Sequence, residues 1–131
     1  MTLTTDPDLH LVIDGVPRRA QWVDSGVYTF SVASVARWVI IASRSVVPLD
    51  IRGADARRLG VPVHRVVLRG GGDQLQISPQ HLGLTDGFND DEGTHRWTNG
   101  WATLPSELLA RFSGEVTIEL HIGTIELEYP A

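Results

Sequence analysis

The stretch 83–105 gathers most of the residue types that could do chemistry in this chain. It holds two of the four tryptophans, and its carboxylates lie close together at Asp86, Asp90, Asp91 and Glu92. Clustered oxygen ligands on a flexible loop suit Ca²⁺, so Asp86, Asp90 and Glu92 form a candidate calcium site. The spacing does not match an EF-hand, and Asp, Asn and Gly are also the residues that solvated turns favour. We expect a turn without a cofactor, with calcium as the alternative.

Trp97 and Trp101 flank Asn99-Gly100, which is a strong signal for a two-residue hairpin. In such a hairpin the two indoles would lie on opposite faces, one in the core and one exposed. An exposed tryptophan beside carboxylates and arginine is typical of sugar-binding surfaces, because the ring stacks on C–H faces while charged groups hold hydroxyls. This pattern predicts a ligand-binding set formed by Asp86, Asp90, Glu92, Arg96 and Trp101. In the alternative, Trp97 fills the core and Arg96 pairs with a loop carboxylate.

The residues that catalysis requires do not fall into recognised motifs. The histidines at 10, 64, 81, 95 and 121 include no H-E-x-x-H sequence, and there is no G-x-S-x-G nucleophile motif. The chain has no cysteine, which removes disulfides, thiolate nucleophiles and cysteine-ligated zinc. Carboxylate pairs for glycoside hydrolysis can be drawn from 86–92 and Glu119, but any acidic protein offers such pairs. We expect a protein that is not an enzyme, with a small metal-dependent hydrolase as the alternative.

Composition and charge narrow the classes of partner. The 131 residues match the size of a single domain, and 42% hydrophobic with 21% charged residues is ordinary for a globular protein. The longest apolar run, at 38–42, is far shorter than the roughly 20 residues of a membrane span, and no signal peptide is evident at 1–11. The net charge is −5 and the arginines are scattered, so we expect no nucleic-acid binding, which needs a clustered positive face. The compartment stays undetermined.

Turn residues divide the chain into short elements. Residues 1–8 are polar and predict a flexible N-terminal tail, which leaves 9–131 as a single domain. Alternating or continuous apolar residues predict strands at 9–13, 18–23, 28–32, 37–43, 61–69, 75–77 and 116–122. Ser106 as a cap, and Leu108 four residues before Phe112, predict one short helix over 106–112. Many short strands between Gly, Pro and Asp turns indicate a mainly β fold, an antiparallel β-sandwich of jelly-roll or Greek-key type.

Two further expectations concern exposed faces. Four glutamates alternate with apolar residues, which is typical of the solvated face of an edge hairpin; they are Glu115, Glu119, Glu126 and Glu128. Three apolar residues are expected to be exposed and to supply an interface for self-association or for a partner domain; they are Val12, Val39 and Ile41.

Three segments carry a resemblance to a known family: DARRLGVPVHRVVLR at 55–69, LTDGFNDDEGTHRWTNGWATLP at 84–105 and VTIELHI at 116–122. The chain resembles the β-rich region that follows the Hint (hedgehog/intein-type) domain in some proteobacterial proteins, and it is similar to modules associated with bacterial glycosyltransferases. The glycine, aromatic and acid of that pattern fall on Gly87, Phe88 and Glu92, and its R-W-T element on 96–98. Hint chemistry itself does not carry over, since it needs a cysteine or serine nucleophile at a splice junction. The resemblance implies an accessory sandwich that contacts surface glycans.

Together these observations predict a non-enzymatic accessory module that binds carbohydrate through the 86–101 loop and hairpin. Trp101 would stack on the sugar, while Arg96, Asp90 and Glu92 would hydrogen-bond to it. The alternative is a structural or assembly module that packs against a partner domain or against itself.

Overall fold

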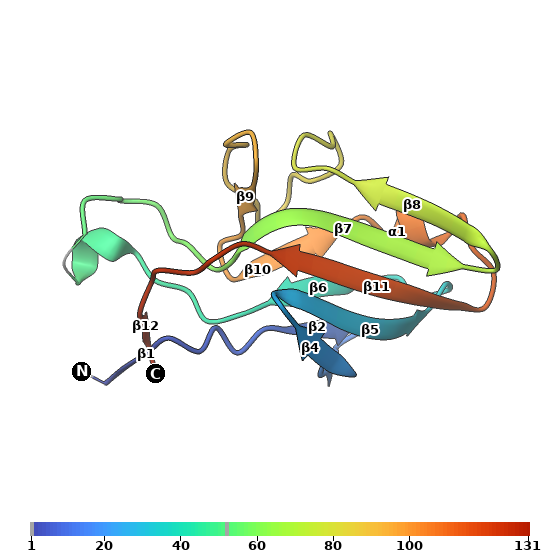
Figure 1. Ribbon diagram of the computed structural model, residues 1–131, viewed down its shortest axis with the longest axis horizontal. Helices are drawn as coiled ribbons and strands as arrows, with labels where there is room; N and C mark the ends of the chain where they lie inside the picture. Colours follow the sequence, from blue (N-terminus) through green and yellow to red (C-terminus); the bar gives the residue numbers. More distant parts are fainter. Residues whose placement is uncertain (1, 52) are drawn as a thin grey trace.

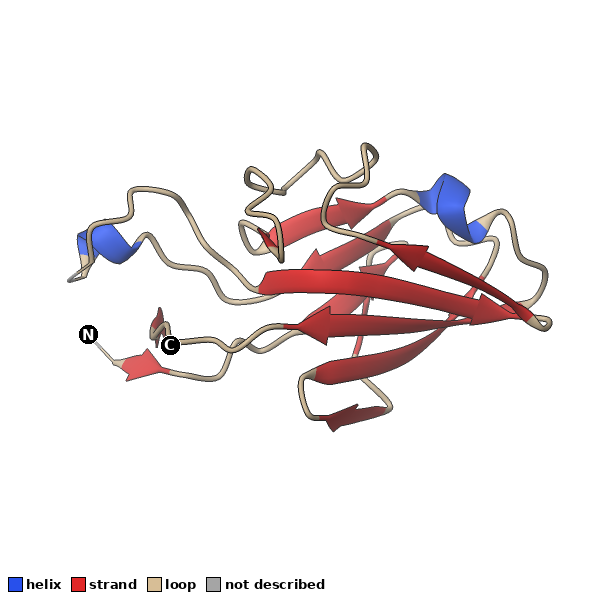
Figure 2. Ribbon diagram, turned by 45° about the horizontal axis from the view of Figure 1, so that its top comes forward, coloured by secondary structure: helices blue, strands red, loops and turns tan. Residues whose placement is uncertain are grey.

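Two antiparallel sheets packed face to face form the body of the molecule (Figures 1 and 2). The computed structural model describes residues 2–51 and 53–131. The four-stranded sheet has the order β10-β6-β2-β3 and consists of β2 (His10–Ile13), β3 (Val16–Arg18), β6 (Val39–Ala42) and β10 (Trp101–Leu104). The six-stranded sheet has the order β4-β5-β11-β7-β8 with β9 also beside β7, and consists of β4 (Trp22–Asp24), β5 (Val27–Ala33), β7 (Pro62–Gly70), β8 (Asp73–Ile77), β9 (Arg96–Trp97) and β11 (Glu115–Ile122).

Alternation along the strands builds one core between the two sheets. In β11, Val116, Ile118 and Leu120 are fully buried, and the residues between them face outward. The same buried cluster contains Val39 and Ile41 of the four-stranded sheet. Burying an aliphatic side chain is worth about 1.5–3 kcal/mol before the entropic cost of ordering it, so this shared core is the main force that holds the sheets together.

The mainly β, antiparallel fold class is confirmed, and so is a short helix in the expected region. Helix α1 (Ser106–Leu109) ends earlier than the predicted 106–112, and it begins after Pro105 without a side-chain cap from Ser106. The only other helical turn in the described residues is η1 (Pro48–Asp50). Within 2–51 and 53–131, neither helix has the length and hydropathy to cross a bilayer.

The strand predicted at 18–23 is wrong, because the chain changes sheets there. Strand β3 ends at Arg18 in the four-stranded sheet, and β4 begins at Trp22 in the six-stranded one. Ser25 and Gly26 both have positive φ, at 50° and 79°, and this turn folds β4 onto β5 as a hairpin. Two short strands therefore replace the single long one.

The segment 1–8, expected to be a flexible tail, contains a paired strand in its described part. Strand β1 (Leu3–Thr4) pairs antiparallel with β12 (Tyr129–Pro130), and the two ends of the chain lie side by side (Figure 1). The backbone N–H of Ala131 also donates to the carbonyl of Thr2 at 3.0 Å. These bonds hold the described part of the segment in place.

The edge position expected for Glu115 and Glu119 is wrong, and so is the exposure expected for Val12, Val39 and Ile41, whereas Glu115, Glu126 and Glu128 are exposed. Glu115 and Glu119 do not lie on an edge hairpin, because β11 is a central strand between β5 and β7. Val39 and Ile41 are fully buried in the core. Val12 is 8% exposed and packs with Ile40 and Ala42 in a small second cluster, which parity places on the outer face of the four-stranded sheet.

Thr98 ties the two sheets together where the chain crosses between them. Its backbone N–H donates to the carbonyl of Val61 at 2.9 Å, and its carbonyl accepts from the N–H of Gly60 at 2.7 Å. Its buried Oγ1 accepts from the N–H of Val61 at 3.1 Å and from that of Gly100 at 3.3 Å. A Cβ on Gly60 would lie 2.4 Å from this Oγ1, so the approach requires glycine. The Tyr129 hydroxyl donates to the carbonyl of Gly60 at 2.6 Å, and burial raises the pKa of Tyr129 to about 12.

We expect Thr98→Val to lower the free energy of unfolding by about 1–3 kcal/mol, because it leaves buried N–H groups without their acceptor. Urea denaturation measures the change. Thr103→Val is the matched control, since the hydroxyl of Thr103 makes an exposed hydrogen bond, and it should change stability by less than about 0.5 kcal/mol. Equal stability of the two variants would contradict the role of Thr98.

Candidate functional site

The hairpin predicted at Asn99-Gly100 is wrong, and this divides the predicted site. Strand β9 pairs with β7 in one sheet, while β10 pairs with β6 in the other. Gly100, at a φ of 99°, makes the crossing, and its carbonyl accepts from the N–H of Ser43 at 3.0 Å. Trp97 and Trp101 therefore belong to different sheets.

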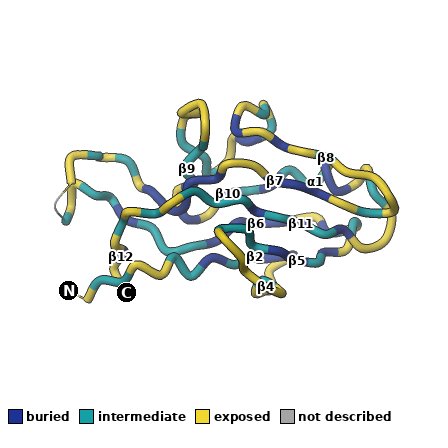
Figure 3. Tube along the Cα trace, in the orientation of Figure 1, coloured by how far each residue is buried: buried dark blue, intermediate teal, exposed yellow. Residues whose placement is uncertain are grey.

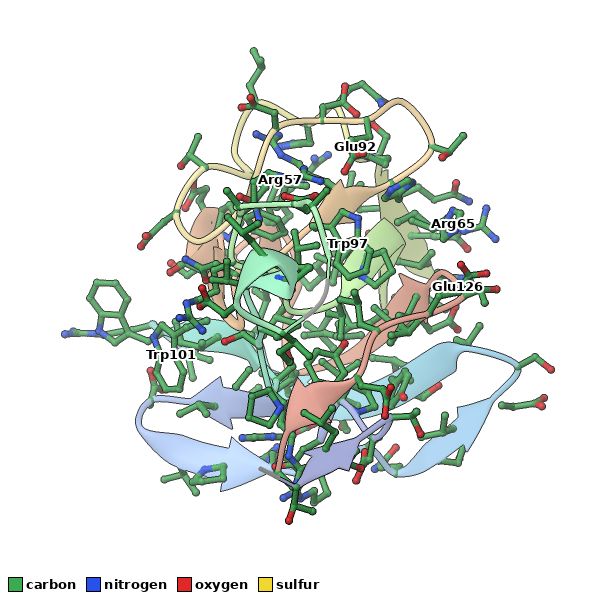
Figure 4. The ribbon with its side chains drawn as sticks, turned by 90° about the vertical axis from the view of Figure 1, so that its left-hand side faces the viewer. Arg57, Arg65, Glu92, Trp97, Trp101 and Glu126 are labelled. Atoms are coloured by element: carbon green, nitrogen blue, oxygen red, sulfur yellow. The ribbon has the colours of Figure 1, made fainter. Side chains whose placement is uncertain are left out.

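Trp101 lies on the outer face of the four-stranded sheet and points into solvent (Figure 4). Its side chain is 57% exposed, and it stands opposite Ala42 in the register of β10 and β6. Alternation places Trp38, which is 64% exposed, on this same face with Ile40 and Ala42. The sequence prediction had missed Trp38, although its even spacing from 40 and 42 was the available signal.

Asp86 is the one predicted carboxylate that lies next to β10. Its backbone carbonyl accepts from the N–H of Thr103 at 2.9 Å, and its Oδ2 accepts from the Thr103 hydroxyl at 3.0 Å. Gly87 follows with a φ of 85°, and a Cβ there would lie 2.2 Å from the carbonyl oxygen of Trp101. Since side chains 101 and 103 share a face, Asp86 and Trp101 are at the same edge of the sheet.

Glu92 lies in a separate cluster, away from Trp101 (Figure 4). Its Oε2 accepts from Nη1 of Arg57 at 3.2 Å, and it lies 3.7 Å from Nε2 of His95. Arg57 also holds Asp55, with Nη2 donating to Oδ2 at 2.7 Å. These hydrogen bonds from Arg57 lower the pKa of Asp55 to about 2. The arginine thus joins the loop that carries Glu92 to the connection after β6.

Arg96 donates hydrogen bonds to backbone carbonyls of the loops before β9 and does not pair with a loop carboxylate. Its Nε donates to the carbonyl of Asn89 at 2.6 Å, and Nη1 donates to that of Pro79 at 3.3 Å. Its guanidinium carbon lies 6.0 Å from the ring centroid of Phe88. Trp97 is half-buried, and its ring meets that of His95 edge-on with centroids 6.3 Å apart.

The predicted set is therefore only partly assembled. Asp86 and Trp101 lie together, Glu92 belongs to the Arg57 cluster, and Arg96 is occupied by backbone carbonyls. Asp90 is exposed on the loop between these positions. In the described part of the chain, no three His, Asp or Glu side chains lie close enough together to hold a metal ion. The candidate calcium ligands Asp86, Asp90 and Glu92 are therefore not brought together.

No family model, curated protein or solved structure matches the chain. The resemblance to the region that follows Hint domains therefore stays a prediction. The function has to be inferred from the surfaces of the molecule itself.

We expect Arg57→Gln to raise the pKa of Asp55 from about 2 part of the way toward its ordinary 3.8, because the substitution removes the guanidinium hydrogen bonds and charge while the bond from the backbone N–H of residue 57 remains. A lowered pKa means that the pair stabilises the fold above about pH 4 and that this contribution is lost as the pH falls toward 2. NMR titration of the Asp55 carboxyl carbon measures the shift. Arg58→Gln is the control, since Arg58 bonds to Ser45 and should leave Asp55 unchanged. An unchanged pKa in Arg57→Gln would contradict the assignment.

Proposed function

We propose that this chain is a non-enzymatic accessory β-sandwich module that binds carbohydrate, with Trp101 as the stacking residue. The observation that carries the proposal is the exposure of Trp101, which is 57% exposed beside polar groups fixed in place. A large apolar ring left in water costs free energy, and stacking on the C–H face of a sugar removes that cost. The carboxylate of Asp86 and the hydroxyl of Thr103 lie at the same edge, where they can bond to sugar hydroxyls.

Trp38 extends this surface into a platform for more than one sugar ring. It lies just before β6 and four residues before Ala42, the partner of Trp101, so the two Cα atoms are about 14 Å apart from the rise and spacing of strands. The proposed ligand is an oligosaccharide that lies across the outer face of the four-stranded sheet and contacts both indoles.

The other predicted residues support the proposal as positioning groups. Arg96 fixes the path of the loop through the carbonyls of Asn89 and Pro79, and Glu92 is neutralised by Arg57. The ion pair with Arg57 ties the loop that carries Glu92 to the connection after β6. Asp90 is exposed on the same loop.

The second candidate is an assembly module, and a specific observation favours it. The outer sheet face carries two exposed tryptophans, Trp38 and Trp101, over a small apolar cluster of Val12, Ile40 and Ala42, each of which is at most 8% exposed. Exposed aromatic residues are also enriched in protein interfaces. The two candidates use the same face and differ in what covers it, a glycan or a protein surface.

Trp101→Ala should weaken oligosaccharide binding about tenfold or more, because it removes the stacking ring, whereas Trp101→Phe should weaken it less. A glycan array followed by calorimetric titration measures the change. Leu82→Ala is the control, since Leu82 is 93% exposed and lies outside the proposed surface.

The assembly module predicts different results in the same samples. Light scattering would find a dimer in the unmodified protein and a monomer in Trp101→Ala. A monomer at high concentration together with glycan binding that depends on Trp101 supports the carbohydrate module. Binding that is unchanged in Trp101→Ala would contradict it.

A further inference from the structure

The outer face of the six-stranded sheet carries a row of polar side chains along its central strand. Alternation in β11 directs Glu115, Thr117, Glu119 and His121 outward, away from the core. The sequence pattern had predicted an edge position for two of these residues, Glu115 and Glu119. Because β11 lies between β5 and β7, they form the middle of a broad sheet face.

Three hollows of about 380, 430 and 480 Å³ follow this row. The first two share His121, and the second and third share Thr117. Their common lining residues place the three hollows next to one another along β11, and together we call them the groove. Arg65 lines the first hollow, and Figure 4 shows it on the opposite side of the molecule from Trp101.

The polar groups of the groove are already held by one another across the strands. Glu119 accepts from Nε of Arg69 at 3.2 Å and lies at the same distance from Nε2 of His121. Arg69 in turn donates to Oε1 of Gln74 at 2.9 Å. The Arg69 guanidinium lowers the pKa of Glu119, so this acceptor stays ionised. Such a row offers donors and acceptors in fixed positions, and a ligand need not order them on binding.

Trp22 supplies an apolar ring at the side of this groove. It lies on the edge strand β4, is 64% exposed, and lines the middle hollow together with Thr29 and Thr117 (Figure 3 shows the exposure of β4). An indole beside threonine hydroxyls and charged donors combines a stacking surface with hydrogen-bonding groups.

We propose that the groove along β11 binds a neutral oligosaccharide, with Trp22 stacking on one ring and Thr117, Glu119 and Arg69 bonding to hydroxyls. The charge of the groove decides the class of ligand. Its lining includes two arginines, Arg65 and Arg69, and four carboxylates, which are Asp24, Asp73, Glu115 and Glu119. A polyanion would meet the carboxylates and a polycation would meet the guanidinium groups. The floor is polar and charged, so an apolar peptide would remove these groups from water without offering them hydrogen bonds in return. A neutral chain that is rich in hydroxyls avoids repulsion by charges of either sign and can form hydrogen bonds with the polar floor.

This inference rests on the proposed carbohydrate-binding function but places a second binding surface on the opposite sheet. The test titrates cellohexaose, xylohexaose and mannohexaose into the full chain by calorimetry and maps the bound surface by amide NMR. Trp22→Ala should weaken binding of the bound probe about tenfold or more. Thr117→Val keeps the side-chain shape and should weaken it about threefold to tenfold. Val23→Ala is the control, because Val23 is exposed on the same strand but does not line the groove.

Each outcome separates the groove from the Trp101 surface. Loss in Trp22→Ala and Thr117→Val, with shifts along β11, supports the groove whether or not Trp101→Ala also weakens binding. Loss in Trp101→Ala alone overturns the groove and leaves the proposed function standing. Binding of none of the three probes overturns both. Tighter binding of hexagalacturonate than of the neutral probes overturns the choice of a neutral ligand.

Discussion

The fold depends on the close contact between Gly60 and Thr98, because this is where the chain leaves one sheet and enters the other. Thr98 is fully buried, and its hydroxyl and backbone together bond to Gly60, Val61 and Gly100. No side chain fits at Gly60, where a Cβ would lie 2.4 Å from the threonine oxygen. The contact fixes the start of β7, the path of the 83–105 stretch and the start of β10.

That constraint determines which surfaces the molecule presents. It sends Trp101 to the outer face of the four-stranded sheet and keeps Trp97 half-buried beside β7. The loop of Glu92 is then held by Arg57 and Arg96, which act on loop geometry. Trp101 thus lies on a different sheet from the other exposed indole of the proposed surfaces, Trp22, which the pairing of β4 with β5 places on the six-stranded sheet.

The local patterns in the sequence predicted much of this fold. Strict alternation predicted β11, and the strand predicted at 61–69 is β7, which begins at Pro62, a residue that cannot donate to a sheet ladder. The turn between β2 and β3 falls on Asp14 and Gly15, residue types that favour turns, and both have positive φ. Each of these features depends on neighbours in the chain.

The partners of the strands could not be predicted, because pairing depends on contacts between distant residues. Asn99-Gly100 has the composition of a hairpin turn, but hydrogen bonds from Gly60 and Ser43 direct it into a crossing. The polar residues of β11 suggested an edge, whereas β5 and β7 cover both of its sides. The predicted site was divided for the same reason. Asp86 is hydrogen-bonded to Thr103 of β10, whereas Glu92 is hydrogen-bonded to Arg57.

The central claim is that the crossing at Thr98 leaves Trp101 in solvent and shields Trp97. Fluorine NMR of protein labelled with 5-fluorotryptophan tests it most directly, with the four resonances assigned by single Trp→Phe variants. We expect the fluorine resonances of the exposed Trp101, Trp22 and Trp38 to shift strongly between H₂O and D₂O, and that of Trp97 to shift clearly less. A shift for Trp97 as large as that for Trp101, or a small shift for Trp101, would contradict it.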